Sequence, residues 1–237
     1  MVYPARTCHD LMPHGQARQQ EHFDPGGNAM LKLYFSPGAC SMAAHIVLEE
    51  SGEKYQSQQV HFADAEQRSE AYLKINPQGR VPALVLDDGE SLAENTAILP
   101  YLGKRFGLWP TDPITEARIL SLIGFLAASV HPSVAHMWRP ERYAADAAVF
   151  PQIQEAGRKT FDGYLEQIDA KLAGRQWFSD QYSVADPYLL VFYPWGLRRG
   201  YPMQELKSFT AFKDRMLQRL AVQNILAREK INLEREA

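Results

Sequence analysis

The chain has 237 residues, of which 46% are hydrophobic and 22% charged, and this composition fits a globular protein rather than a disordered or fibrous one. Its 25 basic and 28 acidic residues give a net charge of -3, so no basic surplus favours binding to nucleic acid or to a membrane surface. Only Cys8 and Cys40 are present, which argues against a disulfide-stapled secreted scaffold and predicts a cytoplasmic protein. We expect no apolar stretch long enough to span a membrane.

The first 29 residues lack sustained periodicity and contain a Gly26-Gly27 pair, so we predict a disordered extension. A second methionine, Met30, stands directly before the first strand pattern, and translation could also begin there. Cys8, His9 and His14 are conceivable metal ligands. Their irregular spacing instead favours a loose polar tail, and we predict no metal site.

A thiol lies where the first predicted helix begins. Residues 31–35 alternate between apolar and polar side chains, which predicts a short strand, and Pro37-Gly38 breaks the chain before a helical pattern starts at Met42. Cys40 therefore falls in a strand-to-helix turn. Unpaired backbone amides and the helix dipole favour negative charge there and can lower the pKa of a cysteine below about 8.5. Cys40 could equally be a small buried hydrophobic residue.

The segments that follow alternate between strand and helix patterns. A second strand over 55–62 precedes a short helix over 66–73, and an apolar run over 81–86 leads into Asp87-Asp88-Gly89-Glu90, a strong hairpin signal. A return strand at 91–92 then leads to a helix over 94–106. The resulting order, βαβα followed by ββα, predicts an α/β domain at 30–108.

From Pro113 onwards the pattern contains only helices. The predicted helices are a first one interrupted at Trp138-Arg139-Pro140, a second over 151–172, a third opened by the capping box Ser183-Val184-Ala185-Asp186, and a last one around 209–220. We therefore predict an all-helical domain at 113–237, and an α/β plus all-α fold class. Several polar or aromatic residues are interpreted as packing or surface: His45, Tyr188, Tyr193 and Trp195 as packing, and Arg198-Arg199 as a solvated turn.

Four motifs in this order and spacing resemble the glutathione transferases, in particular the bacterial beta class. They are Leu33 to Ser41, Asn76 to Leu84, Asp87-Asp88-Gly89 and Ser183 to Asp186, and the similarity extends from Met30 to about Arg228. The resemblance implies a thioredoxin-like N-terminal domain that holds glutathione. It also implies a helical domain with the second-substrate site, and a homodimer.

The resemblance also implies roles for individual residues around the glutathione sulfur. Cys40 matches a cysteine that lies close to this sulfur, and His131 matches a histidine that faces it from the domain interface. Val81 and Pro82 match a motif in which a cis-proline presents the preceding backbone to the cysteinyl unit of glutathione. A lone histidine before a proline, such as His131, could instead merely end a helix.

Two further matches concern the charged ends of glutathione. Glu94 and Asn95 match the pair that receives the γ-glutamyl end, where a helix N-terminus can bind the carboxylate while Glu94 balances the ammonium. Glu94 and Asn95 could instead simply cap the following helix. Arg80 could meet the glycine carboxylate or be a solvated turn residue.

Three departures from the family pattern affect these expectations. Phe35 stands where many relatives carry a tyrosine, so activation of a thiolate by a phenol is not expected. Residues 63–70 lack the lysine that beta-class proteins often use on the glycine carboxylate, and Arg68 and Arg80 are the candidates to replace it. Gly124 stands where relatives often place an asparagine that reaches the partner subunit.

The function that the resemblance implies is conjugation of the glutathione thiolate to small, electrophilic, mostly apolar substrates, as in detoxification. The helical-domain side chains that could shape an apolar pocket are Phe125, Met137, Trp138 and Tyr143. One alternative is glutathione-dependent disulfide exchange through Cys40, by a one-cysteine route. Another is a noncatalytic binding protein on the same fold.

Overall fold

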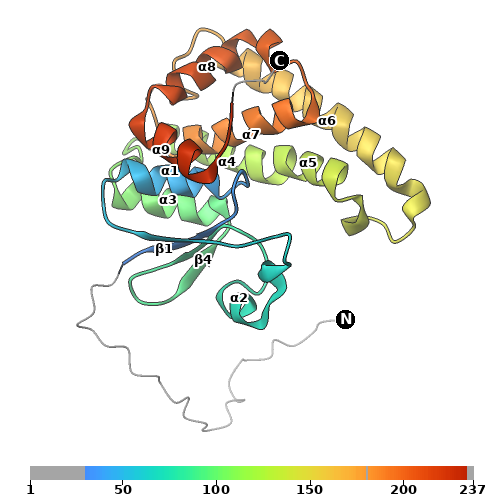
Figure 1. Cartoon of the computed structure of the whole chain (residues 1–237). Coiled ribbons are helices and arrows are strands. Elements are labelled where there is room, and N and C mark those ends of the chain that lie inside the picture. Colours follow the sequence, from blue (N-terminus) through green and yellow to red (C-terminus); the bar gives the residue numbers. More distant parts are fainter. Residues whose placement is uncertain (1–29, 180, 234–237) are drawn as a thin grey trace, which may run out of the picture.

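The computed structural model describes residues 30–179 and 181–233 (Figure 1). The predicted extension at 1–29, with Cys8, His9 and His14, lies outside the described residues. Within them, strands and helices alternate up to Arg105, and only helices follow from Pro113. This arrangement confirms the predicted α/β plus all-α fold class.

A four-stranded mixed sheet organises the first part of the chain. Its strands are β1 (Lys32–Phe35), β2 (Gln56–Gln59), β3 (Ala83–Val85) and β4 (Ser91–Ala93). Their order is β2-β1-β3-β4, with β1 parallel to β2 and the other neighbours antiparallel. The second strand is shorter than the predicted 55–62, because its four polar residues form an exposed edge.

Helices cover both faces of this sheet. Helices α1 (Met42–Glu50) and α3 (Asn95–Arg105) lie above the sheet in Figure 1, and α2 (Glu70–Ile75) lies below it. The strand alternation explains these layers, since Leu33 and Phe35 join the core cluster that contains α1 whereas Tyr34 packs with Tyr72 of α2. The predicted helix at 66–73 divides into a 3-10 turn (Glu66–Arg68) and α2, because the Ser69 side chain accepts the Tyr72 N–H and caps a new helix.

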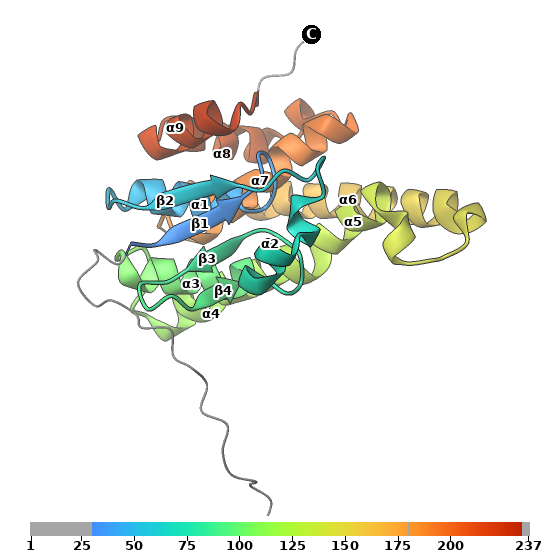
Figure 2. The same cartoon turned by 60° about the horizontal axis from the view of Figure 1, so that its bottom comes forward.

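Six further helices, the first two joined by a π-helical turn, build the second part of the described chain. They are α4 (Pro113–Phe125), continued by the π-helical turn Leu126–Val130 into α5 (His131–Trp138), then α6 (Phe150–Leu172), α7 (Ala185–Arg199), α8 (Lys207–Leu217) and α9 (Leu220–Glu229). Short 3-10 turns lie at Pro140–Arg142, Ala147–Val149 and Met203–Glu205. Helix α7 is central, since every residue from 185 to 196 is buried. Helix α1 packs against both α7 and α9 (Figure 2), so one core runs through both parts.

The capping box before α7 forms as predicted. The Asp186 carboxylate accepts the backbone N–H of Ser183 at 2.8 Å, and the Ser183 hydroxyl accepts the N–H of Ala185 at 3.3 Å. Asp186 also accepts the N–H of Phe178, which ties the preceding loop to the helix. Burial of the Asp186 carboxyl raises its pKa to about 6 despite these donors.

One helical stretch is longer and more apolar than predicted. Residues Pro113–Trp138 form a continuous 26-residue helix whose best 18-residue window has a mean hydropathy of 1.5, enough by length and composition to cross a membrane. The expectation that no stretch reaches this length is therefore wrong. Here the helix packs against α3, α6 and α7, and core helices of soluble proteins have the same length and composition, so it is weak evidence for a membrane span.

Candidate active site

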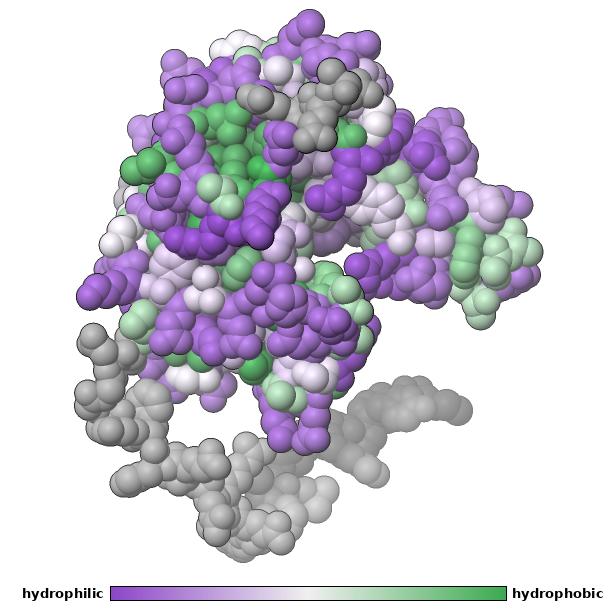
Figure 3. All heavy atoms as spheres, in the orientation of Figure 1, coloured by the Kyte–Doolittle hydropathy of each residue, from purple (hydrophilic) through white to green (hydrophobic). Residues whose placement is uncertain are grey.

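A cleft of about 480 Å³ lies between the sheet-bearing part and the helical part. Figure 3 shows a hollow at this level, between the lower half of the molecule and the arm that carries α5 and α6. All seven residues predicted to form the site line this cleft: Cys40, Arg80, Val81, Pro82, Glu94, Asn95 and His131. They come from the turn before α1, the entry to β3, the start of α3 and the start of α5.

Cys40 is a buried thiol in the wall of the cleft. Its Sγ donates a weak hydrogen bond to the carbonyl oxygen of Val81 at 3.5 Å. Burial raises the pKa of the Cys40 thiol to about 12, with a further contribution from the Glu94 charge. The backbone amides of Cys40 and Ser41 lower the pKa, as the helix-start argument predicted, but by less than burial raises it. Of the two interpretations of Cys40, a thiol with a lowered pKa or a small buried residue, burial therefore favours the second, and the thiol is protonated at neutral pH.

The turn that carries Cys40 is fixed by distant parts of the chain. The Gly38 N–H donates to Glu229 Oε2 at 2.9 Å, and the Gly38 carbonyl accepts from Trp195 Nε1 at 2.8 Å. Glu229 Oε1 in turn lies 2.7 Å from His45 Nδ1, with both side chains fully buried. Trp195 and His45 thus pack as predicted, but they also bind the polar groups that hold this turn.

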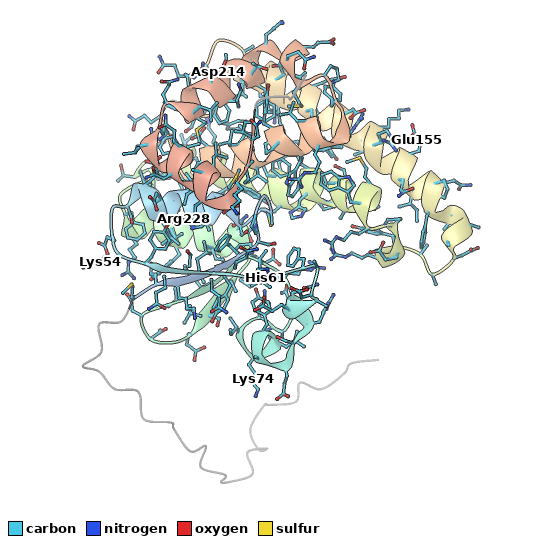
Figure 4. The ribbon with its side chains drawn as sticks, viewed as in Figure 1. Lys54, His61, Lys74, Glu155, Asp214 and Arg228 are labelled. Carbon is cyan, nitrogen blue, oxygen red and sulfur yellow. The ribbon has the colours of Figure 1, made fainter. Side chains whose placement is uncertain are left out.

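The neighbouring Arg228 adds a second tie between α9 and α1, at the position labelled in Figure 4. Its guanidinium donates to Glu49 Oε2 at 3.2 Å and to the Tyr55 hydroxyl at 2.6 Å. Helix α9 therefore holds α1 as well as the turn before it.

The Val81-Pro82 peptide bond is cis, as the resemblance implied. The turn before it is held by two side chains, because the Tyr72 hydroxyl and the Asn76 amide both donate to the carbonyl oxygen of Arg80, at 2.7 and 2.8 Å. These bonds fix the backbone at Arg80, whose side chain lines the cleft.

Two buried acceptors in the cleft wall have no hydrogen-bond partner among the described residues. They are Asn95 Oδ1 and Gln67 Oε1. The Asn95 Nδ2 donates to the Cys40 carbonyl at 2.9 Å, so the orientation of this amide is fixed. A buried acceptor without a partner costs about 1–3 kcal/mol, and a donor on a ligand would satisfy it.

Glu94, next to Asn95, has a strained backbone. Its φ of 68° is in the left-handed region, which costs a residue with a side chain on the order of 1–3 kcal/mol and is concentrated at functional sites. Its side chain makes no capping hydrogen bond to α3, so simple capping by Glu94 is excluded. The arrangement leaves a carboxylate in the cleft beside the free backbone amides of a helix start.

His131 begins α5 directly after the π-helical turn, inside a continuous helix, so it does not end one. Its ring lies edge-on to the Trp195 ring, with centroids 5.0 Å apart. Burial, followed by the charges of Arg80 and Arg142, lowers the pKa of His131 to about 4. The imidazole is therefore neutral at neutral pH and can donate one hydrogen bond but holds no positive charge.

The cleft contains more arginines than Arg80 and Arg68, the two that the sequence analysis considers for glutathione. Its lining includes five arginines and one carboxylate, that of Glu94; the arginines are Arg68, Arg80, Arg139, Arg142 and Arg198. The prediction of a turn at Arg198-Arg199 is wrong, although Arg198 is exposed to solvent as predicted. Both residues lie in the last turn of α7, where Arg199 pairs with Asp162 while Arg198 lines the cleft.

Sequence reasoning missed Arg139, Arg142, Arg198 and Tyr188 as cleft residues. A local signal is the run Arg139-Pro140-Glu141-Arg142, whose first two residues the sequence analysis interprets, with Trp138, as a helix interruption. Of the side chains expected to shape an apolar pocket, Trp138 and Tyr143 line the cleft. Met137 is buried and Phe125 packs against Tyr164 of α6.

The fold and the cleft together define a thioredoxin-like α/β unit joined to a helical bundle, with a thiol, a carboxylate and basic groups at the junction. Residues 29–104 match the family described as Glutathione S-transferase, N-terminal domain. Glutathione S-transferase GstA of Escherichia coli O157:H7 is 30% identical over 205 residues, which cover 84% of this chain and 98% of that protein. Glutathione S-transferase GST-4.5 of Xanthomonas campestris is 34% identical over 85% of this chain and 100% of that protein.

Solved structures of glutathione transferases also resemble this chain. A glutathione transferase homologue from Sulfitobacter with bound glutathione superposes with a TM-score of 0.80 at 34% identity, covering 84% of this chain and 98% of that one. A bacterial beta class glutathione S-transferase from Sphingomonas chungbukensis gives 0.74 at 32% identity, covering 85% and 100%. The chain therefore belongs to the glutathione transferase family.

Proposed function

We propose that this protein binds reduced glutathione in the cleft and conjugates its thiolate to a small electrophile. The observation that carries the proposal is the start of α3. There the backbone of Glu94 is strained, and the next residue, Asn95, has a buried Oδ1 without a hydrogen-bond partner among the described residues. Reduced glutathione has an ammonium and a carboxylate at one end, a thiol in the middle and a second carboxylate at the other end. A carboxylate, an unsatisfied acceptor and free helix amides in one place fit the first of these ends.

The proposed roles of the remaining cleft residues follow from their chemistry. The backbone at Val81, which lines the cleft, would pair with the cysteinyl unit. Arg80, with Arg68 beside it in the lining, would bind the glycine carboxylate. Cys40 and His131 would face the sulfur, and both are neutral hydrogen-bond donors at neutral pH.

In the proposed reaction the glutathione thiol gives its proton to solvent, the sulfur forms a bond to the electrophilic carbon, and the leaving group departs with the bonding electron pair. Preorganised donors stabilise the sulfur anion, and holding both reactants in one cleft removes much of the entropic cost of their encounter. A thiol with a pKa of about 12 is a poor nucleophile but a competent donor. The burial of Cys40 thus favours conjugation over disulfide exchange through this residue.

The proposal includes the wider organisation of the molecule. Residues 30–108 would form the glutathione-binding domain and 113–237 the domain with the second-substrate site, in a cytoplasmic, beta-class-like homodimer that serves detoxification. Ile114 and Leu120, exposed on α4, are available to an interface between two copies. Sedimentation equilibrium tests the dimer, and a mass equal to one chain would rule it out.

The first experiment measures conjugation of reduced glutathione to 1-chloro-2,4-dinitrobenzene by the wild type and by Cys40→Ala and Glu94→Gln variants. We expect activity in the wild type and retention within roughly tenfold in Cys40→Ala, because a donor and not a nucleophile is removed. Glu94→Gln should raise the KM for glutathione by roughly 10-fold or more, since it loses the charge that pairs with the ammonium.

Calorimetry with reduced glutathione accompanies this assay. Binding without turnover would contradict the enzymatic proposal and favour a binding protein. Disulfide exchange would be favoured if the wild type showed no conjugation but Cys40 attacked oxidised glutathione, releasing one reduced glutathione and leaving a Cys40-glutathione adduct that added reduced glutathione removes.

A further inference from the structure

The basic side of the cleft has more positive charge than glutathione explains. Five other arginines of the described chain pair with carboxylates: Arg105 with Asp87, Arg158 with Glu155, Arg199 with Asp162, Arg219 with Glu50 and Arg228 with Glu49. The five arginines of the cleft have no ion pair among the residues that the structure describes, and neither have Arg118, Arg175 and Arg215 outside it. What distinguishes the cleft is that it gathers five such arginines around one acidic residue, Glu94. Glutathione has two carboxylates and one ammonium. Glu94 balances the ammonium, so the two carboxylates are left to pair with the five arginines.

Three of these arginines come from the helical part, on the side of the second substrate. Arg139 follows α5 and lies with its Cζ 5.9 Å from the ring of Phe62, so its guanidinium reaches across the cleft toward the sheet-bearing part. Arg142 lies one turn further on. Arg198, at the end of α7, lies over the Trp138 ring at 5.8 Å.

Arg198 also lies against the turn that carries Cys40. A Cβ built on Gly38 would be 2.9 Å from Arg198 Nη2, and the φ of Gly38 is +67°, so glycine at this position allows the guanidinium to approach the backbone. A positive charge from the helical part is thereby held next to the turn where the glutathione sulfur would lie.

The charges of Arg80, Arg139 and Arg142 repel one another. Burial together with the charges of Arg139 and Arg80 lowers the pKa of Arg142, and Arg80 and Arg142 both lower the pKa of His131. Clustered like charges without a counter-charge are unfavourable, and an anion bound among them would relieve the repulsion. Guanidinium groups are well suited to this, because their planar donors match a carboxylate in a bidentate way.

We propose that the preferred electrophile of this enzyme is an anion, a small aromatic or unsaturated carboxylate, whose carboxylate is held by Arg139, Arg142 and Arg198. The inference rests on the proposed function and replaces the expectation of mostly apolar substrates. Trp138 and Tyr143, which also line the cleft, would pack against the apolar body of this substrate, while the arginines select its charge.

The test compares two substrates that differ in one charge, 4-chloro-3,5-dinitrobenzoate and 4-chloro-3,5-dinitrobenzamide. For each, kcat/KM is divided by the rate constant of its uncatalysed reaction with glutathione, which removes the difference in intrinsic reactivity. We expect the wild type to favour the benzoate by about 10-fold or more at low salt, and the preference to shrink as ionic strength rises.

The variants are Arg139→Gln, Arg142→Gln, Arg198→Gln and the pair Arg139→Gln with Arg142→Gln. The paired variant should lose roughly 5- to 50-fold in kcat/KM for the benzoate, while the amide and the KM for glutathione change less than about twofold. Arg158→Gln is the matched control, because Arg158 is an arginine on the outer part of α6, where its partner Glu155 is labelled in Figure 4. It should leave both substrates unchanged.

The possible results distinguish failure of the anionic-substrate proposal from failure of the proposed transferase function. Conjugation of both probes with equal normalised rates overturns the anionic substrate and leaves the transferase standing. Equal losses for benzoate and amide in the arginine variants also overturn it, because they indicate a structural role. Absence of conjugation for both probes in the wild type, despite glutathione binding, overturns the proposed function and this inference with it.

Discussion

At the scale of single residues, burial decides the protonation of both groups proposed to face the sulfur. Cys40 stands at a helix start, which favours a thiolate, and yet burial raises its pKa to about 12. His131 stands among arginines in a partly buried position, and its pKa falls to about 4. Desolvation disfavours the charged form in both cases, a thiolate in one and an imidazolium in the other.

The lowered pKa of His131 predicts a specific dependence of stability on pH. Between the unfolded value of 6.5 and the folded value of about 4, the unfolded chain binds more protons at this residue than the folded chain does. Stability is therefore fully present above pH 6.5 and is lost as the pH falls toward 4, by up to about 3 kcal/mol from this group.

The measurement is urea unfolding at several pH values between 7.5 and 4 for the wild type and His131→Gln. Other carboxyl groups titrate in the same range, so the difference between the two proteins isolates His131. We expect the free energy of unfolding of the wild type to fall more steeply. Parallel curves would show that the histidine titrates alike in both states.

At the scale of elements, the contact between α5 and α6 depends on a single glycine. A Cβ on Gly157 would lie 2.8 Å from the backbone oxygen of Ser133 and 3.0 Å from the backbone nitrogen of Met137. A Cβ on Gly163, six residues further along α6, meets no atom within 4 Å. Substitution at Gly157 therefore tests the packing of α6 on α5, whereas substitution at Gly163 tests only the helix propensity of the residue.

Replacing each glycine by alanine should have opposite effects. Gly157→Ala forces α5 away from α6 and should lower the free energy of unfolding by about 1–3 kcal/mol. Gly163→Ala removes only backbone freedom and should raise it by about 0.5–1 kcal/mol. Thermal or urea unfolding of both variants measures this pair, and a stabilised Gly157→Ala would show that the helices are not in close contact.

Local patterns predicted the elements, and the order of motifs predicted which side chains meet in the cleft. The Leu33 to Phe35 alternation and the Asp186 capping box form because neighbours in sequence determine them. Arg139, Arg142 and Arg198 could not be predicted as cleft residues, because only the packing of the folded chain places them in the cleft wall. The two interpretations of Cys40 stay open at the level of the sequence for a related reason, since the burial that raises its pKa depends on the whole fold and not on the helix start.

At the scale of the whole molecule, the two parts share one hydrophobic core. Helix α1 lies between the sheet and the helices α7 and α9, and its buried residues belong to the same cluster as Leu33 of β1 and Leu189 of α7. The turn before α1 is bonded to Trp195 and Glu229 of the helical part. A molecule with this continuity should unfold as a unit.

Separate signals from the sheet-bearing part and the helical part can test whether the molecule unfolds as a unit. All four tryptophans of the chain, Trp109, Trp138, Trp177 and Trp195, lie after the sheet, while the backbone amides of β1, an inner strand, report on the sheet-bearing part. We expect tryptophan fluorescence and hydrogen exchange of the β1 amides, measured by mass spectrometry, to change at the same urea concentration, because β1 shares one core with Trp109, Trp177 and Trp195. The midpoints should coincide at each protein concentration used, since dimerisation would shift both together. Exchange of the β1 amides at clearly lower urea than the fluorescence change would show that the sheet-bearing part opens alone and that the shared core does not couple the two.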